Sequence, residues 1–226
     1  MLYKTRGIVI NYIRYKESSI IVKIFTEQFG IQSYIVNGVR SKKGSKIALY
    51  QPLTLLELVV YHKYNANLFR ISEIKCPEPF NNIPKDIKRS CIAMFLTEVL
   101  SKALKGETEP KLFDFIYQTI LFLEHIEVNF ENIHLQFLLK LSRYLGFEPE
   151  SEVEILDQIG QVPVENEQIN EPALLKALLV SDYTNDIKIN NRSRRKLLDI
   201  LLKYYSLHIE SFGEMKSVVV LKEVME

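Results

Sequence analysis

Residues 19–26 read Ser-Ile-Ile-Val-Lys-Ile-Phe-Thr, a run of β-branched and aromatic side chains that is typical of a β-strand. The next four residues, Glu27-Gln28-Phe29-Gly30, have the composition of a turn, and Ile31–Val39 forms a second run of the same kind. Two such runs joined by a short turn that ends in glycine predict a β-hairpin.

Three further runs of this type surround the hairpin. Thr5–Tyr15 precedes it, and Leu53–His62 and Asn67–Lys75 follow it. Five short strands that begin with a meander are typical of a small closed barrel. The segment Cys76-Pro77-Glu78-Pro79-Phe80 then ends the strand pattern, because its two prolines cannot donate to a sheet.

After this segment the hydrophobic period becomes helical. Helices are predicted at Ile83–Lys105, Pro110–Glu127, Phe130–Phe147, Glu171–Ser181 and from Asn190 to about Glu210. Gly146 is expected to end the third of them. The predicted fold class is therefore α+β, with a five-stranded barrel over residues 1–79 and a helical domain over residues 80–226.

The segment from Glu148 to Glu171 contains eight acidic residues and no Lys or Arg, and Gly160 and Pro163 interrupt it. This composition favours a solvated loop inserted into the helical domain. The alternative is an acidic flap that imitates DNA and competes with it for a basic surface.

Charge is divided unequally along the chain. The whole sequence has a net charge of +1, but residues 1–80 contain 12 Lys and Arg against 5 Asp and Glu, and the remainder contains 17 against 23. A basic segment joined to an acidic one is typical of a nucleic-acid-binding module attached to a second domain.

The basic residues of the N-terminal part gather in two places. The loop Gly38–Lys46 has no acid and contributes Arg40, Lys42, Lys43 and Lys46, and the first strand and its end contribute Lys4, Arg6, Arg14 and Lys16. Clustered cations neutralise phosphates and release counterions, and aromatic side chains between them stack on unpaired bases. Tyr12, Tyr15 and Tyr34 are the stacking candidates, with burial in the barrel as the alternative for each.

The last long helix opens with three arginines, Arg192, Arg194 and Arg195. Positive charge at a helix N-terminus opposes the helix dipole. These arginines are therefore candidates for binding phosphate or an acidic peptide end, and a plain solvated face is the alternative.

Several function classes find no support in the sequence. There is no Gly-rich phosphate loop and no set of paired carboxylates in a recognisable motif. Cys76 and Cys91 lie fifteen positions apart and the four histidines are scattered, so we expect reduced thiols, no metal site and no enzyme activity. Since no signal peptide or long apolar stretch is present, the expected location is the cytoplasm.

Three segments resemble the bacterial recombination mediator family RecO. The first runs from Glu17 to Gly30 and continues over Tyr34–Lys43; the second is Phe137–Pro149; the third combines Tyr204–Ile209 with Leu221–Val224. The resemblance implies an oligonucleotide-binding (OB) barrel followed by a helical domain. Many members of the family also carry a four-cysteine zinc motif after the Gly-Phe-x-Pro segment, but residues 150–170 contain no Cys, so zinc is predicted to be absent here.

The resemblance also implies partners. RecO-like proteins bind single- and double-stranded DNA, anneal complementary strands, engage the acidic tail of single-stranded-DNA-binding protein, and act with RecR to help load RecA. It implies that the cations named above contact DNA, in the cytoplasm at the nucleoid, and that the acidic tail docks on the helical domain. Arg143 is the candidate for this docking, because His134, Leu135 and Gln136 stand where cations are expected.

Two other hypotheses remain at this point. The chain is an adaptor whose helical part binds a protein while the barrel serves only as a scaffold, or it is a nuclease or another DNA enzyme. The adaptor predicts DNA affinity with little dependence on salt. The nuclease predicts a cluster of carboxylates that binds a divalent metal.

Overall fold

The computed structural model describes residues 1–39, 46–63, 66–106, 108–161, 171–210 and 212–225. Its residues form two compact units. The first consists of Met1–Asn82 with Leu104–Leu121, and the second of Ile83–Ala103 with Phe122–Glu226. The predicted boundary at residue 79 differs from this division, because residues 104–121 pack with the barrel although they are mostly helical.

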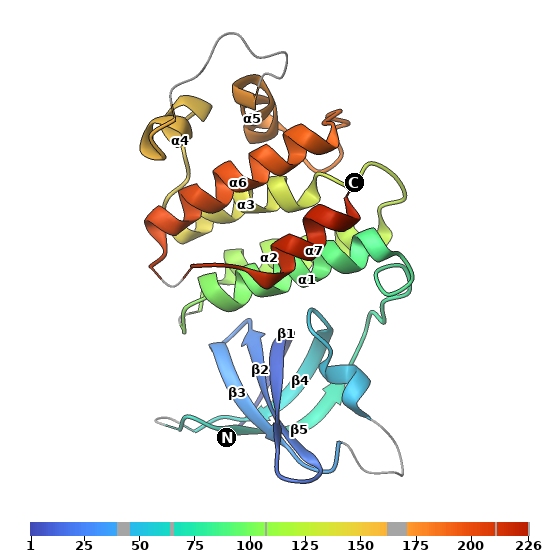
Figure 1. Ribbon diagram of the computed structural model, residues 1–226. Coiled ribbons are helices and arrows are strands. Elements are labelled where there is room, and N and C mark those ends of the chain that lie inside the picture. Colours follow the sequence, from blue (N-terminus) through green and yellow to red (C-terminus); the bar gives the residue numbers. More distant parts are fainter. Residues whose placement is uncertain (40–45, 64–65, 107, 162–170, 211, 226) are drawn as a thin grey trace. The chain divides into compact units, whose positions relative to one another are not determined.

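The first unit contains a closed barrel of five strands (Figure 1). The strands are β1 (Leu2–Tyr15), β2 (Ser19–Thr26), β3 (Gly30–Val36), β4 (Leu55–Tyr61) and β5 (Phe69–Lys75). They are ordered β1-β2-β3-β5-β4, and the barrel closes through a short parallel pairing between β3 and β5. The predicted barrel is confirmed, and its strand order is that of an OB-fold.

Strand β1 is long enough to pair with two neighbours. Its first half pairs with β4 and its second half with β2, and Gly7 lies in both registers, opposite Leu56 and Thr26. A Cβ atom at Gly7 would lie 2.7 Å from Cγ2 of Ile24 and 2.9 Å from Cδ1 of Leu58. Glycine therefore permits the close packing at the point where β1 passes from one sheet neighbour to the other.

Alternate residues of the strands fill the barrel. Val9, Val22, Ile24, Tyr34 and Val60 are fully buried in one hydrophobic cluster. Because side chains alternate between the two faces of a strand, the residues between them point outward and form the surface on which a ligand could bind. A short 3-10 helix, η1 (Lys46–Tyr50), follows the third strand and was not predicted.

The helices are α1 (Ile87–Ala103), α2 (Pro110–His125), α3 (Ile133–Leu145), α4 (Glu152–Gln158), α5 (Glu171–Val180), α6 (Asn191–His208) and α7 (Lys216–Val224). Five of them confirm the predicted helices within a few residues at each end. Gly146 ends α3 with a φ of 83°, as predicted, because glycine adopts this left-handed conformation without steric cost.

The acidic insertion was predicted as a loop, and this is wrong for its first part. Ser151 caps α4 by accepting a hydrogen bond from the backbone N–H of Glu154, and Ile155 and Leu156 are buried. The motif Ser-x-x-Glu at a helix start could have revealed this helix from the sequence. Residues 162–170 of the insertion lie outside the described residues. No described helix is long and apolar enough to cross a membrane.

Candidate nucleic-acid interface

A row of outward-facing side chains crosses all five strands of the barrel. Strand register places each member opposite the next, in the order Leu2, Tyr61, Arg70, Ile35, Ile21 and Ile13. We call these six residues the outer row. Arg70 is exposed, and Ile13, Leu2 and Tyr61 are each more than half exposed. The row is thus mainly apolar, with one guanidinium near its middle.

A second, polar row lies beside the first. Lys23 on β2 pairs with Asn11 on β1 and Ser33 on β3, and its side chain is exposed. Since Ile21 precedes Lys23 by two positions on β2, the two rows occupy the same outer face. This face of β2 and β3 is the one on which OB-folds bind oligonucleotides.

The turn between β1 and β2 borders this face with further cations. Arg14, Tyr15 and Lys16 are exposed, and Nζ of Lys16 lies 5.4 Å from the centre of the Tyr15 ring. The turn is tied to the end of β3, because the hydroxyl of Ser19 donates to Oδ1 of Asn37 at 3.0 Å. We call Arg14, Lys16, Lys23 and Arg70 the strand-face cations.

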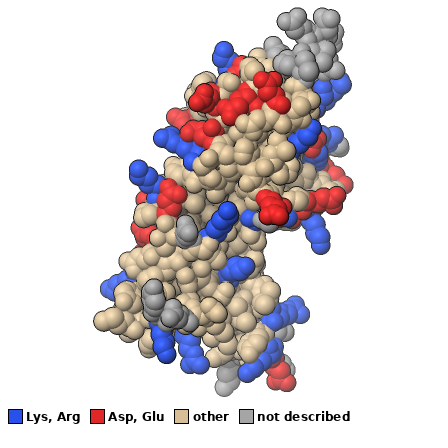
Figure 2. Space-filling model, turned by 90° about the vertical axis from the view of Figure 1, so that its left-hand side faces the viewer, with Lys and Arg blue, Asp and Glu red and all other residues tan. Residues whose placement is uncertain are grey.

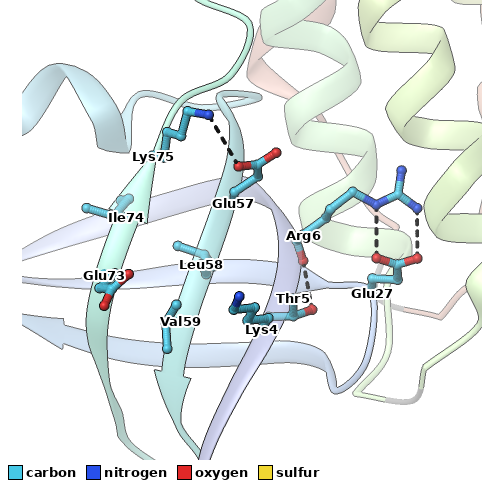
Figure 3. A pocket seen from close by; sticks show the side chains of 10 residues that line it. All are labelled: Lys4, Thr5, Arg6, Glu27, Glu57, Leu58, Val59, Glu73, Ile74 and Lys75. Atoms are coloured by element: carbon cyan, nitrogen blue, oxygen red, sulfur yellow. Dashed lines mark hydrogen bonds and ion pairs between the residues drawn. The ribbon is translucent and has the colours of Figure 1, made fainter.

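Three acids of the barrel gather beside the outer row, where Val59 and Glu73 lie next to Tyr61 and Arg70 on the outer face of β4 and β5. A pocket of about 460 Å³ lies on the outside of β1, β4 and β5 (Figure 3). It contains three cations, Lys4, Arg6 and Lys75, and three acids, Glu27, Glu57 and Glu73. We call it the balanced pocket, because its formal charges cancel.

Arg6 lies at the edge of the balanced pocket, where its partly exposed guanidinium contacts two carboxylates and two aromatic rings. Its Nε and Nη2 donate to the two carboxylate oxygens of Glu27 at 2.9 and 2.7 Å, and Nη2 also donates to Asp114 at 2.7 Å. The guanidinium carbon lies 5.1 Å from the ring centres of both Phe113 and Tyr117. Hydrogen bonds from Arg6 lower the pKa of Glu27, and those to Glu27 raise the pKa of Arg6.

Charge is therefore divided around the barrel as well as along the sequence. Of the five acids in residues 1–80, three lie in the balanced pocket, and only Glu17 neighbours the strand-face cations along the chain. On the face shown in Figure 2, the charged side chains of the barrel, in the lower part of the view, are mainly Lys and Arg, whereas both signs mix on the helical unit. An OB barrel with one unbalanced cationic face is the arrangement expected of a protein that binds a polyanion.

Comparison with known proteins gives the family. Residues 1–80 match the family model described as "Recombination protein O N terminal", and residues 84–156 match "Recombination protein O C terminal". A protein of Bacteroides fragilis named DNA repair protein RecO is 36% identical over an alignment of 242 positions that covers 100% of both chains. This chain belongs to the RecO family. A protein of the same name from Flavobacterium johnsoniae is 37% identical, with 99% of each chain covered.

The structure places the predicted DNA contacts of this RecO family member in different settings. Arg14, Lys16 and Lys46 are exposed, whereas Arg40, Lys42 and Lys43 lie outside the described residues. Lys4 is exposed, but it lies in the balanced pocket, which also contains Glu27, Glu57 and Glu73. The prediction of Arg6 as a DNA contact conflicts with the structure, because two carboxylates and two rings already surround its guanidinium.

The aromatic prediction was wrong for Tyr34. Its ring is fully buried, at 6.0 Å from the ring of Phe69, and burial raises the pKa of its hydroxyl. Tyr12 is half-buried against the core, and only Tyr15 is exposed among the three candidates. Sequence reasoning missed Tyr61, although the alternation of Glu57, Val59 and Tyr61 along β4 predicts that all three point outward.

The arginines of α6 serve mainly to join helices. Arg194 is buried and donates to Oδ1 of Asn132, Oδ1 of Asn191 and the carbonyl of Ile189 at 2.8 to 3.0 Å, so its prediction as a DNA contact is wrong. Arg195 donates to the carbonyl of Lys222, at the end of α7. Arg192 is exposed. Hydrogen bonds within the helical unit thus explain two of the three cations that oppose the helix dipole.

The candidate contact for the acidic tail, Arg143, lies on the helical unit. Arg143 is exposed on α3, with Nε 3.7 Å from a carboxylate oxygen of Glu148. His134 is fully buried; burial, followed by the charge of Arg194, lowers its pKa to about 3, so it carries no charge at neutral pH. Among the described residues, no group of three or more His, Cys, Asp or Glu side chains is placed to hold a metal ion.

Proposed function

We propose that this RecO family member binds single- and double-stranded DNA through the strand-face cations and the basic loop that follows β3, and anneals complementary strands. One observation carries this proposal: three of the five acids in residues 1–80 lie in the balanced pocket, whereas the strand-face cations form no ion pair with a described residue, which leaves positive charge on and beside the outer face of β2. Each phosphate neutralised there would release condensed counterions, and this release drives the binding.

Annealing follows from the same charge. Two complementary strands repel each other through their phosphates, and a cationic surface that binds both lowers this repulsion. Since backbone contacts carry no sequence information, the protein would act on any pair of complementary strands. We propose no catalytic residue for this activity, because bringing strands together requires no bond to be broken.

The partners belong to the proposal as well. We propose that the acidic tail of single-stranded-DNA-binding protein docks on the helical unit, with Arg143 as the candidate contact, and that RecR joins the complex and helps to load RecA. The names of the relatives, DNA repair protein RecO, support the repair pathway. The cytoplasm, at the nucleoid, is the place where these partners would be met.

The test is annealing of complementary strands coated with their single-strand-binding protein. Wild type is compared with a variant in which Arg40, Lys42 and Lys43 are all replaced by Glu. We expect the variant to lose most of the annealing rate, and wild-type DNA affinity to fall by decades between 50 and 200 mM salt. Unchanged annealing by the variant, together with weak salt dependence, would instead favour the adaptor hypothesis.

A further inference from the structure

Tyr61 and Arg70 stand side by side at the middle of the outer row. They are directly opposite each other in the register of β4 and β5, so their Cβ atoms are about 5 Å apart on one face of the sheet. Tyr61 is 52% exposed, and Arg70 is exposed. The side chain of Arg70 forms no ion pair or hydrogen bond with any residue that the structure describes, although its backbone pairs with β3 and β4.

The opposite face of the same two strands is fixed by stacked rings. His62 follows Tyr61 and Phe69 precedes Arg70, and the rings of His62 and Phe69 stack with centres 4.9 Å apart and an interplanar angle of 11°. Phe29 stacks on the other side of His62, at 4.2 Å and 10°. The strand ends that carry Tyr61 and Arg70 are thus held before any ligand arrives, which reduces the entropy that binding must overcome.

The surroundings of the pair favour an anion. The neighbours of Tyr61 and Arg70 in the outer row are Leu2 and Ile35, which carry no charge. The nearest acid along β5 is Glu73, which pairs with Val59 and lines the balanced pocket. An exposed ring beside an unpaired guanidinium matches a nucleotide, because the ring stacks on the base and the guanidinium binds the phosphate.

We infer that Tyr61 and Arg70 form a preorganised site for one nucleotide of an unpaired DNA strand, and that Tyr61 makes the barrel prefer single strands over duplex. This inference rests on the proposed DNA-binding function. A base in a duplex is already stacked and paired, so its face is not available to Tyr61, whereas the phosphate that Arg70 binds is present in both forms. Tyr61 therefore supplies strand selectivity and Arg70 supplies affinity.

The test measures the affinities of the full-length protein for an unstructured single strand and for a duplex of equal length. Tyr61→Leu is expected to weaken single-strand binding about tenfold and duplex binding less than twofold, because it removes one stacked base. Tyr61→Phe keeps the ring and is expected to retain wild-type selectivity. Arg70→Gln is expected to weaken both forms and to reduce the salt slope for the single strand by about 0.7.

Lys75→Gln is the matched control for Arg70→Gln. It also removes one exposed positive charge, but from the balanced pocket, where Lys75 lies 3.8 Å from Glu57. The inference would be overturned if Lys75→Gln and Arg70→Gln lowered DNA affinity equally. It would also be overturned if Tyr61→Leu left the affinities for single strand and duplex unchanged, or reduced both equally. If the wild-type protein binds neither the single strand nor the duplex, the proposed function itself fails. If the wild-type protein binds DNA but Tyr61→Leu does not change its affinities, only the inference about this site fails.

Discussion

Replacing Arg6 by Met separates a structural role from a DNA contact. Methionine keeps much of the aliphatic length of Arg6 but removes the guanidinium, which holds Glu27 on the β2–β3 turn and Asp114 on α2. It therefore breaks the links between β1 and these two segments of the first unit. We expect the variant to be less stable and to bind DNA with nearly wild-type affinity.

The size of the loss follows from the contacts. The bidentate bond to Glu27 joins two side chains that are 34% and 32% exposed, so it contributes about 1 to 2 kcal/mol. The bond to Asp114, which is 56% exposed, adds at most about 0.5 kcal/mol, and the two ring contacts add about 0.5 kcal/mol each. Part of this is regained through the apolar packing of Met, so we expect a loss of about 2 kcal/mol.

The stability of the variant should also depend less on pH. Arg6 lowers the pKa of Glu27 below its ordinary value of 4.5 in the folded chain. The contribution of a carboxyl group with a lowered folded pKa is present above its unfolded pKa and is lost as the pH falls through the folded value. Wild type should therefore lose more stability than Arg6→Met when the pH is lowered from 6 to 3.

The assay is urea unfolding at pH 7 and at acidic pH, followed by DNA titration at fixed salt. A double-mutant cycle with Glu27→Gln isolates the coupling of the two side chains, which we expect to be about 1 kcal/mol or more. The reasoning is refuted if Arg6→Met changes stability by less than about 0.5 kcal/mol and lowers DNA affinity tenfold, because Arg6 would then be a phosphate contact.

Two further predictions concern the helical unit. Arg194→Met is expected to cost about 3 kcal/mol in urea unfolding, since it leaves buried acceptors without a donor, whereas Arg192→Gln should change stability by less than about 0.5 kcal/mol; equal costs would contradict the assigned roles. Burial opposes ionisation of Glu98, but hydrogen bonds from Lys216 and Ser217 at the start of α7 lower its pKa overall. Hydrogen exchange in α7 should therefore accelerate as the pH falls below 4.5 once intrinsic rates are corrected, and Glu98→Gln should show fast exchange already at pH 7.

Much of the fold could be predicted because strands and helices leave local periodic patterns. The runs around Ser19–Thr26 and the helical spacing after Phe80 are properties of neighbouring residues. Helix α7 was missed because its start depends on Glu98, more than a hundred positions earlier. Its three consecutive valines, Val218–Val220, also favour a strand when considered alone.

It was harder to predict which cations belong to the candidate site, because tertiary structure decides which of them are paired with other residues. Arg6 and Lys16 look alike in the sequence, but only the fold brings Glu27 and Asp114 to Arg6, from 21 and 108 positions away. The arginines of α6 pose the same problem, since the sequence does not distinguish the exposed Arg192 from the buried Arg194. The wrong tyrosine was predicted to be exposed, Tyr34 instead of Tyr61, for a simpler reason. Each strand has two faces, and which of them is buried depends on the register of the strand with its neighbours.

In the proposed function, the position of a cation on the barrel, and not the net charge of the chain, determines how much it contributes to DNA binding. The most direct test compares two double charge reversals that change the net charge equally: Lys16→Glu with Lys23→Glu among the strand-face cations, and Lys4→Glu with Lys75→Glu in the balanced pocket. We predict that the first pair lowers single-strand affinity at least tenfold and reduces the salt slope, and that the second pair lowers it less than threefold. Equal losses in both variants, or a larger loss in the second, would contradict this account.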